Sequence, residues 1–145
     1  MINDDARREL FLQAKLIFRG HFGNECLFVS TKCLALFQKS HPDAFVAIGI
    51  CEKNGREGKV EPIIHFLKNP TNTAPIYHAW IELGNGDIAD LTLAQTHDRR
   101  EEMQEYQNSY IDAAAARKIG ITYHCVIMDP IEVARFEELI RNATN

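Results

Sequence analysis

One segment of the chain, from about Glu25 to Lys39, is apolar around nearly its whole circumference. Its apolar residues recur at helical spacing, and His41-Pro42 ends it because a residue before proline is pushed out of the helical conformation. A helix that is hydrophobic on every side is stable only when other elements cover it. The segment therefore predicts a helix in the middle of the domain, around which the other elements pack.

The order of the remaining segments indicates the fold class. We expect helices over Asp4–Arg19, Ser109–Lys118 and Asp129 to about Arg141, and strands over Ala44–Cys51, Val60–Leu67, Tyr77–Leu83, Asp87–Thr92 and Ile121–Met128. Helices followed by mostly consecutive strands and then by helices favour α+β with an antiparallel sheet over alternating βαβ units.

Length and composition indicate one globular domain, residues 1–145. The 145 residues are 46% hydrophobic and 25% charged, and the net charge is −4. No basic field is present that would favour a nucleic-acid partner. No signal peptide and no apolar run of membrane-spanning length are visible, so we expect no membrane partner, a cytoplasmic protein (secretion as an effector stays open) and thiols instead of disulfides.

Two predicted strands carry a histidine and an aspartate whose relative position depends on the loop Gly84-Asn85-Gly86. A two-residue turn would place His78 and Asp90 on opposite faces of the hairpin. A three-residue loop would make Asp90 the diagonal neighbour of His78, close enough for one hydrogen bond. Asp87 fails in both registers, because it lies on the wrong face or roughly 20 Å along the strand.

A nucleophile for this pair is expected at the start of the apolar helix. Cys26 lies in its first turn, where unpaired N–H groups and the helix dipole favour thiolate over thiol. Cys33 lies two turns deeper and suits a small core residue. We therefore predict a catalytic triad of Cys26, His78 and Asp90, with the aspartate orienting the imidazole.

Further residues are candidates for oxyanion or substrate contacts. The backbone N–H of Cys26 is the natural oxyanion donor, and the side chain of Asn24 is a second candidate. Trp80, on the same strand face as His78, is a candidate substrate contact, although an aromatic residue there also suits the core. The cysteines contain no C-x-x-C pair, so we expect neither a metal nor a cofactor.

The chain resembles the transglutaminase-like branch of the papain-like cysteine proteases. The likeness lies in Cys26-Leu27-Phe28-Val29-Ser30 with Leu34 and Leu36, an apolar strand, His78-Ala79-Trp80-Ile81-Glu82, and Asp90. Within that branch it is most similar to the leader-peptide proteases of lasso-peptide biosynthesis, whose pattern is C-L-x-x-S, H-A-W-[VI]-E and an aspartate about twelve residues after the histidine.

The resemblance implies a central helix carrying Cys26, packed on an antiparallel sheet carrying His78 and Asp90. It also implies a thiol hydrolase that cleaves an amide in a peptide or protein substrate, with a possible partner protein delivering that substrate. Two alternatives remain open. The acyl group could pass to an amine, as in an acyltransferase or transglutaminase, or the domain could be an inactive binding module of the same fold.

Overall fold

The structure, a computed structural model, describes residues 4–18, 25–53, 59–92, 110–112, 118 and 120–143. Its helices are α1 (Asp4–Ile17), α2 (Cys26–Gln38), α3 (Glu61–Lys68) and α7 (Pro130–Ala143). Its strands are β1 (Phe45–Lys53), β2 (His78–Glu82), β3 (Asp87–Ala89), β4 (Tyr110–Asp112) and β5 (Ile121–Ile127). Among the residues described, no helix combines the length and the apolar character that crossing a membrane requires.

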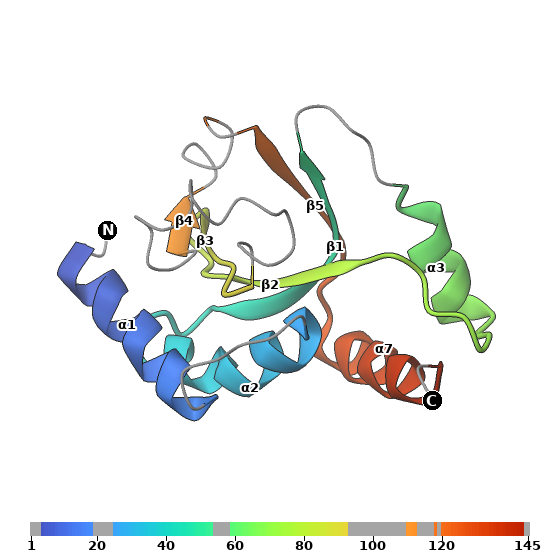
Figure 1. Cartoon of the computed structure of the whole chain (residues 1–145), viewed down its shortest axis with the longest axis horizontal. Coiled ribbons are helices and arrows are strands. Elements are labelled where there is room, and N and C mark those ends of the chain that lie inside the picture. Colours follow the sequence, from blue (N-terminus) through green and yellow to red (C-terminus); the bar gives the residue numbers. More distant parts are fainter. Residues whose placement is uncertain are drawn as a thin grey trace.

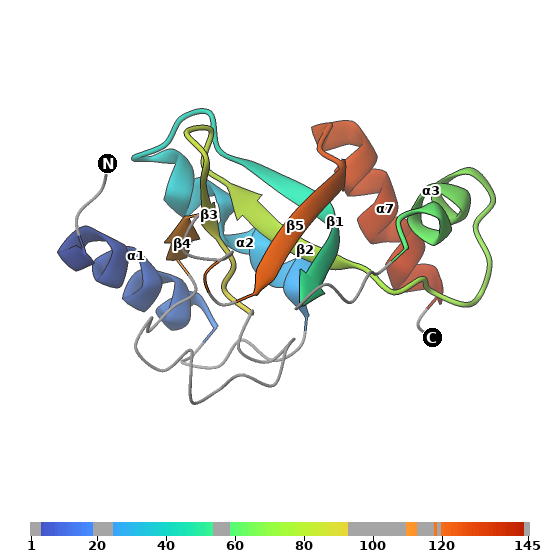
Figure 2. The same cartoon turned by 90° about the horizontal axis from the view of Figure 1, so that it is seen from above.

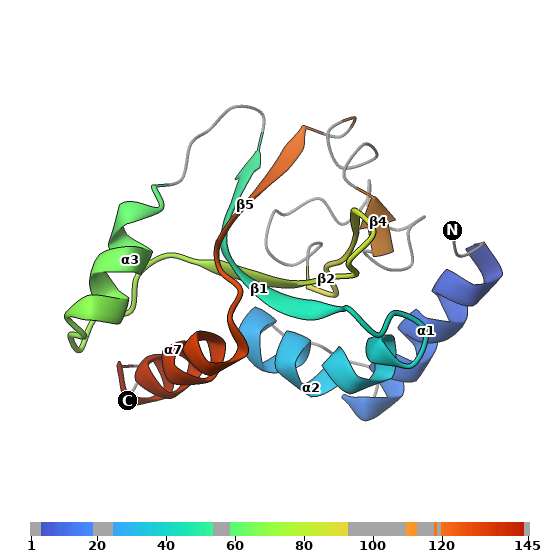
Figure 3. The same ribbon diagram turned by 180° about the vertical axis from the view of Figure 1, so that it is seen from behind.

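A five-stranded antiparallel sheet forms the centre of the molecule, with strand order β4-β3-β2-β1-β5. The sheet curls, and α2 and α7 lie on one side of it, with α1 and α3 towards its two ends (Figures 1 and 2). The expectation of a mixed α+β domain with an antiparallel sheet is thereby confirmed. The view from behind shows α1, α2 and α7 beneath the strands and α3 beside them (Figure 3).

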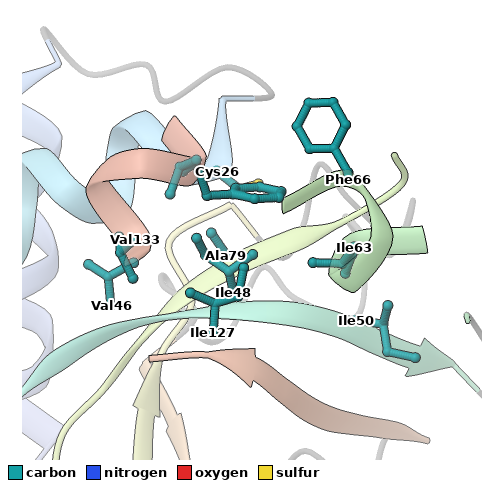
Figure 4. Packing of buried hydrophobic residues seen from close by; sticks show 11 residues of the cluster. Cys26, Val46, Ile48, Ile50, Ile63, Phe66, Ala79, Ile127 and Val133 are labelled. Carbon is teal, nitrogen blue, oxygen red and sulfur yellow. The ribbon is translucent and has the colours of Figure 1, made fainter. Parts of the chain in front are cut away.

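The core lies between the helices and one face of the sheet, in two clusters. The first joins α1 and α2 to the hairpin of β2 and β3. The second joins the start of α2 to β1, α3 and α7, and Figure 4 shows its side chains gathered between helices and strands, Cys26 among them. Helix α2 contributes to both, which gives it the predicted central place.

Helix α2 is not covered on every side, however. Phe28 keeps 40% of its surface exposed, and Lys32 and Ala35 are exposed as well. Their spacing of four and three residues places them on one stripe of the helix. The apolar sequence of α2 therefore predicts more burial than the structure has, because α1, the sheet and α7 leave this stripe exposed to solvent.

Two secondary-structure predictions are wrong. The segment Val60–Leu67, expected as a strand, is occupied by α3, whose buried residues Ile63 and Phe66 follow the three-residue spacing of a helix. Pro62 lies in the first turn of α3, where its missing N–H leaves no hydrogen bond unmade. A short apolar run reads equally well as strand or helix, and here packing against α7 through Phe66 and Phe136 favours the helix.

The expected helix over Ser109–Lys118 also fails at its start, because Tyr110–Asp112 form β4 and pair with β3. Pairing with the edge of β3 holds these three residues in a strand. Residues 113–117, which carry those alanines, lie outside the described residues.

The last helix begins as predicted. The Asp129 carboxylate accepts hydrogen bonds from the backbone N–H groups of Ile131 and Glu132, at 2.8 and 3.3 Å. This cap satisfies two of the donors that a helix start leaves unpaired. Asn3 and Gly20, which flank the helix predicted over Asp4–Arg19 as its cap and its stop, lie outside the described residues.

Gly49 is the tightest point of the sheet. It pairs with His78 on one side and Cys125 on the other, beside an irregularity in the register with β5. A Cβ atom here would overlap the carbonyl group of His124. Only glycine therefore lets β5 approach β1 this closely, directly beside the strand position of His78.

We predict that Gly49→Ala destabilises the domain by at least about 2 kcal/mol, because backbone must move to relieve the overlap. Urea unfolding measures the change. Gly86→Ala is the matched control, since its φ of 95° carries backbone strain but a Cβ there meets nothing within 4 Å. A Gly49→Ala protein that unfolds at the same urea concentration as the parent contradicts the close approach of β5.

Candidate functional site

The hairpin that carries the histidine and the aspartate has the three-residue loop. Ile81 pairs with Ala89 and Glu82 with Ile88, and the N–H of Leu83 donates to the carbonyl of Asp87 at 3.0 Å. Gly84 and Gly86 have φ values of 86° and 95°, a conformation that other residues adopt only with strain. The two glycines therefore make the odd loop possible, and the odd loop sets the register.

This register brings His78 and Asp90 together. Nε2 of His78 lies 2.6 Å from Oδ2 of Asp90, and the two residues are 3% and 0% exposed. Asp87 starts β3 at the far, turn end of the hairpin. The predicted geometry of the pair, including the exclusion of Asp87, is confirmed.

A tyrosine from a distant part of the chain completes the environment of the carboxylate. The Tyr123 hydroxyl, on β5, donates to the same Oδ2 of Asp90 at 2.8 Å. Sequence reasoning missed Tyr123 because its contact requires β5 to pair with β1, on the far side of the sheet from β3. The sequence does show a tyrosine on the last predicted strand, but it does not indicate which residue the hydroxyl would contact.

Trp80 occupies a different place from the one expected for a substrate contact. The indole is 0% exposed and packs between the rings of His78 and Tyr123, with centroid distances of 5.9 and 4.9 Å. Its N–H donates to Glu82 at 2.8 Å. With its donor used and no surface exposed, Trp80 supports the imidazole and does not reach a substrate, so that prediction is corrected.

Cys26 meets the histidine from the helix side. It is the first residue of α2, is 8% exposed, and lies close enough to His78 to contribute to the raised pKa of the imidazole. In Figure 1 the first turn of α2 lies near the end of the sheet at which β2 begins. The predicted proximity of the cysteine and the histidine is thereby present.

The hydrogen bonds define how the imidazole is protonated. A carboxylate only accepts, so Nε2 of His78 carries the proton directed at Asp90. Nδ1 is then the ring atom left to exchange a proton with another group. An imidazole fixed at one nitrogen by a carboxylate and directed by the other at a thiol is the arrangement of an oriented general base.

The surroundings favour the charged form of His78. Burial alone would lower its pKa, but the charge and the hydrogen bond of Asp90, with smaller contributions from Cys26, raise the pKa to about 10. The imidazolium is therefore the stable form at neutral pH.

Cys51 is a second thiol near the pair, which sequence reasoning did not single out. Its sulfur, a ring nitrogen of His78 and a carboxylate oxygen of Asp90 all lie within 4.8 Å of one another. Burial and the Asp90 charge both raise the pKa of Cys51, and a smaller contribution from the Tyr123 side chain lowers it. Cys51 is consequently held as a neutral thiol and is a poor nucleophile.

The same three residues are those that could hold a metal ion. Around tetrahedral zinc, with bonds of about 2.0–2.2 Å, nitrogen and oxygen ligands stand roughly 3.3 Å apart. The 2.6 Å separation of His78 Nε2 and Asp90 Oδ2 is instead that of a charge-assisted hydrogen bond. The arrangement therefore suits proton transfer better than metal coordination.

Cys33 and Asn24 are the remaining residues for which the sequence predicts a role. Cys33 is fully buried in the core and burial raises its pKa to about 12, in keeping with a structural thiol. Asn24, the candidate oxyanion donor, lies outside the described residues.

We predict that the His78–Asp90 pair makes stability depend on pH in a defined direction. The pKa of His78 is raised from 6.5 to about 10, so the pair contributes fully below pH 6.5 and its contribution is lost as pH rises towards 10. Breaking the pair with His78→Gln should cost about 3–5 kcal/mol at pH 6.

Urea unfolding of the parent and of His78→Gln across pH 6–10 measures this effect, because the other titrating groups are common to both proteins. The stability difference between them should shrink as pH rises. A difference that stays constant over this range contradicts a charged pair.

Comparisons with known proteins find no relative: no family model, no curated protein and no solved structure matches the chain. A function for this chain therefore rests on the site itself.

Proposed function

We propose that the protein is a thiol hydrolase that cleaves an amide bond in a peptide or protein through an acyl-enzyme on Cys26. The observation that carries the proposal is the buried His78–Asp90 hydrogen bond of 2.6 Å, and Cys26 at the start of α2 lies close enough to act on the same imidazole. His78 serves as general base and acid, and Asp90 holds the ring and its charge.

The steps follow from the positions of these groups. In the resting ion pair Nδ1 of His78 already holds the proton of the Cys26 thiol, and the thiolate attacks the amide carbonyl to form a tetrahedral oxyanion. The imidazolium then protonates the departing amine as the C–N bond breaks, which leaves a thioester. Water, deprotonated by His78, attacks the thioester, and the acid and the Cys26 thiol are released.

The oxyanion needs donors that are already in place. Cys26 is the first residue of α2, and the N–H groups of a helix's first turn have no intrahelical partner. The Cys26 backbone N–H is therefore the first donor, and Asn24 remains the predicted second one. The positive end of the helix dipole adds to the same stabilisation.

Cys26 is favoured over Cys51 on electrostatic grounds. Cys51 lies beside the Asp90 carboxylate, whose charge opposes a thiolate there. Cys26 instead lies near the His78 imidazolium and at the start of a helix. The same pair of charges thus activates one sulfur and suppresses the other.

The family resemblance supports the same reading. A cysteine-bearing helix packed on an antiparallel sheet that carries the histidine and the aspartate is the arrangement that the transglutaminase-like proteases imply. Here α2 packs on β2, which starts at His78, and Asp90 directly follows β3. Among members of that branch, a peptide-cleaving enzyme fits the H-A-W-I-E segment best.

We predict that iodoacetamide labels Cys26 selectively at about pH 6, because only a thiolate reacts and only Cys26 is paired with an imidazolium. Mass spectrometry of the intact native protein and of its peptides identifies the labelled residue. Cys125 is the internal control, since it is exposed but its pKa is raised by burial and by Glu82.

His78→Ala should remove the selectivity, and Cys26→Ser should remove the label. Equal labelling of Cys26 and Cys125 at this pH, or labelling centred on Cys51, would falsify the assignment of the nucleophile.

We further predict that Asp90→Asn slows the acylation of Cys26 by p-nitrophenyl acetate at pH 7 by at least about tenfold. Each unit by which the pKa of His78 falls should lower the acylation rate by roughly one order of magnitude. Tyr123→Phe is the matched variant, because it removes one hydrogen bond from Oδ2 but keeps the charge, and should slow acylation less. Stopped-flow release of p-nitrophenolate gives both rates. Asp90 has no orienting role if the two variants behave alike.

A further inference from the structure

A pocket of about 440 Å³ lies beside the proposed nucleophile. Its lining includes Glu25 and Leu27, the two chain neighbours of Cys26, and Tyr77, which precedes His78. Each reacting side chain therefore has an adjacent residue in the pocket wall. A group entering this pocket would be attached to a substrate atom close to the scissile bond.

The walls are mainly apolar. Leu27, the half-exposed Phe28 and Ile140 line the pocket, together with the ring of Tyr77, which packs edge-on against Phe136. Phe28 belongs to the stripe of α2 that the core leaves uncovered. Such walls suit the aliphatic stem of a long side chain, which buries methylene groups while its head stays near water.

The charged side chains that line the pocket include more carboxylates than cations. Glu137 is already bonded, since it accepts from the Thr31 hydroxyl at 2.9 Å and from Arg141 at 3.3 Å. Glu25 is exposed at the mouth. With two carboxylates and one guanidinium in the lining, the pocket carries a net charge of −1, and Glu25 supplies the unbalanced carboxylate.

A second observation indicates the same negative field. Burial and the charges of Cys26, Glu137 and Glu25 all raise the pKa of Tyr77. The Tyr77 hydroxyl thus lies where the nucleophile and both carboxylates act together. Lys32, a cation outside the lining, lies over the ring of Phe28, with Nζ 5.9 Å from the ring centroid.

We propose that this pocket receives the side chain of the substrate residue whose carbonyl is attacked, and that this residue is lysine or arginine. The inference rests on the proposed function and names its substrate class. The methylene stem contacts Leu27, Phe28 and Ile140, and the cationic head meets Glu25. A glutamate in the same position would meet a carboxylate and be rejected.

Three peptidyl acyloxymethyl ketones test the proposal on the full chain. They are identical except for the residue next to the electrophile, which is lysine, norleucine or glutamate. Norleucine has nearly the stem length of lysine but no charge. We expect the lysine probe to label Cys26 about three- to fivefold faster than the norleucine probe, the size of a partly exposed ion pair, and the glutamate probe to be slowest.

Two variants separate charge from packing. Glu25→Gln should bring the ratio of lysine to norleucine rates close to one. Phe28→Ala should slow both probes alike and leave that ratio unchanged, because it removes the wall that the two stems share. The ratio is the readout, since Glu25→Gln also removes a negative charge next to the sulfur and changes its absolute reactivity.

Iodoacetamide, which has no side chain to place, distinguishes the two proposals. Selective iodoacetamide labelling of Cys26 together with a lysine-to-norleucine ratio of one overturns the pocket assignment and leaves the thiol hydrolase standing. A Cys26 that resists iodoacetamide overturns both. A norleucine probe that outpaces the lysine probe shows an apolar subsite and also contradicts the proposal.

Discussion

The buried contact between His78 and Asp90 is the interaction on which the site depends. Asp90 has no exposed surface, and an isolated carboxylate without water would be strongly destabilised. Two hydrogen bonds, from His78 and Tyr123, and the imidazolium charge offset that penalty on Oδ2. Oδ1 has no hydrogen-bond partner among the described residues. The stability of the buried carboxylate therefore depends on the hydrogen bonds to Oδ2.

Several features of the fold serve this contact. The loop of Gly84 and Gly86 sets the register that turns Asp90 towards His78. Gly49 lets β5 approach β1, and β5 carries Tyr123 to the carboxylate. Trp80 packs against both the histidine and the tyrosine rings. The pair therefore links the β2–β3 hairpin to β1 and β5, which come from distant parts of the chain, and α2 adds the cysteine from outside the sheet.

How much of this could be predicted depends on the range of each interaction. The His78–Asp90 geometry followed from a loop length and the two-residue period of strands, both of which are local. The start of α2 at Cys26 and the Asp129 cap were local as well. Tyr123 and Cys51 were not, since their place beside Asp90 requires the pairing of β5 with β1. The same limit explains the helix at Glu61–Lys68 and the strand at Tyr110–Asp112, where packing and edge pairing decided the structure.

The central claim is that Asp90 keeps His78 protonated so that it can pair with a Cys26 thiolate. An NMR titration of the His78 ring signals, assigned with His78→Gln, tests it most directly. The account predicts that His78 stays protonated through neutral pH, with a pKa near the value of about 10 set by Asp90, and that Asp90→Asn lowers this pKa markedly. A His78 that titrates near pH 6.5 in both proteins would contradict the account.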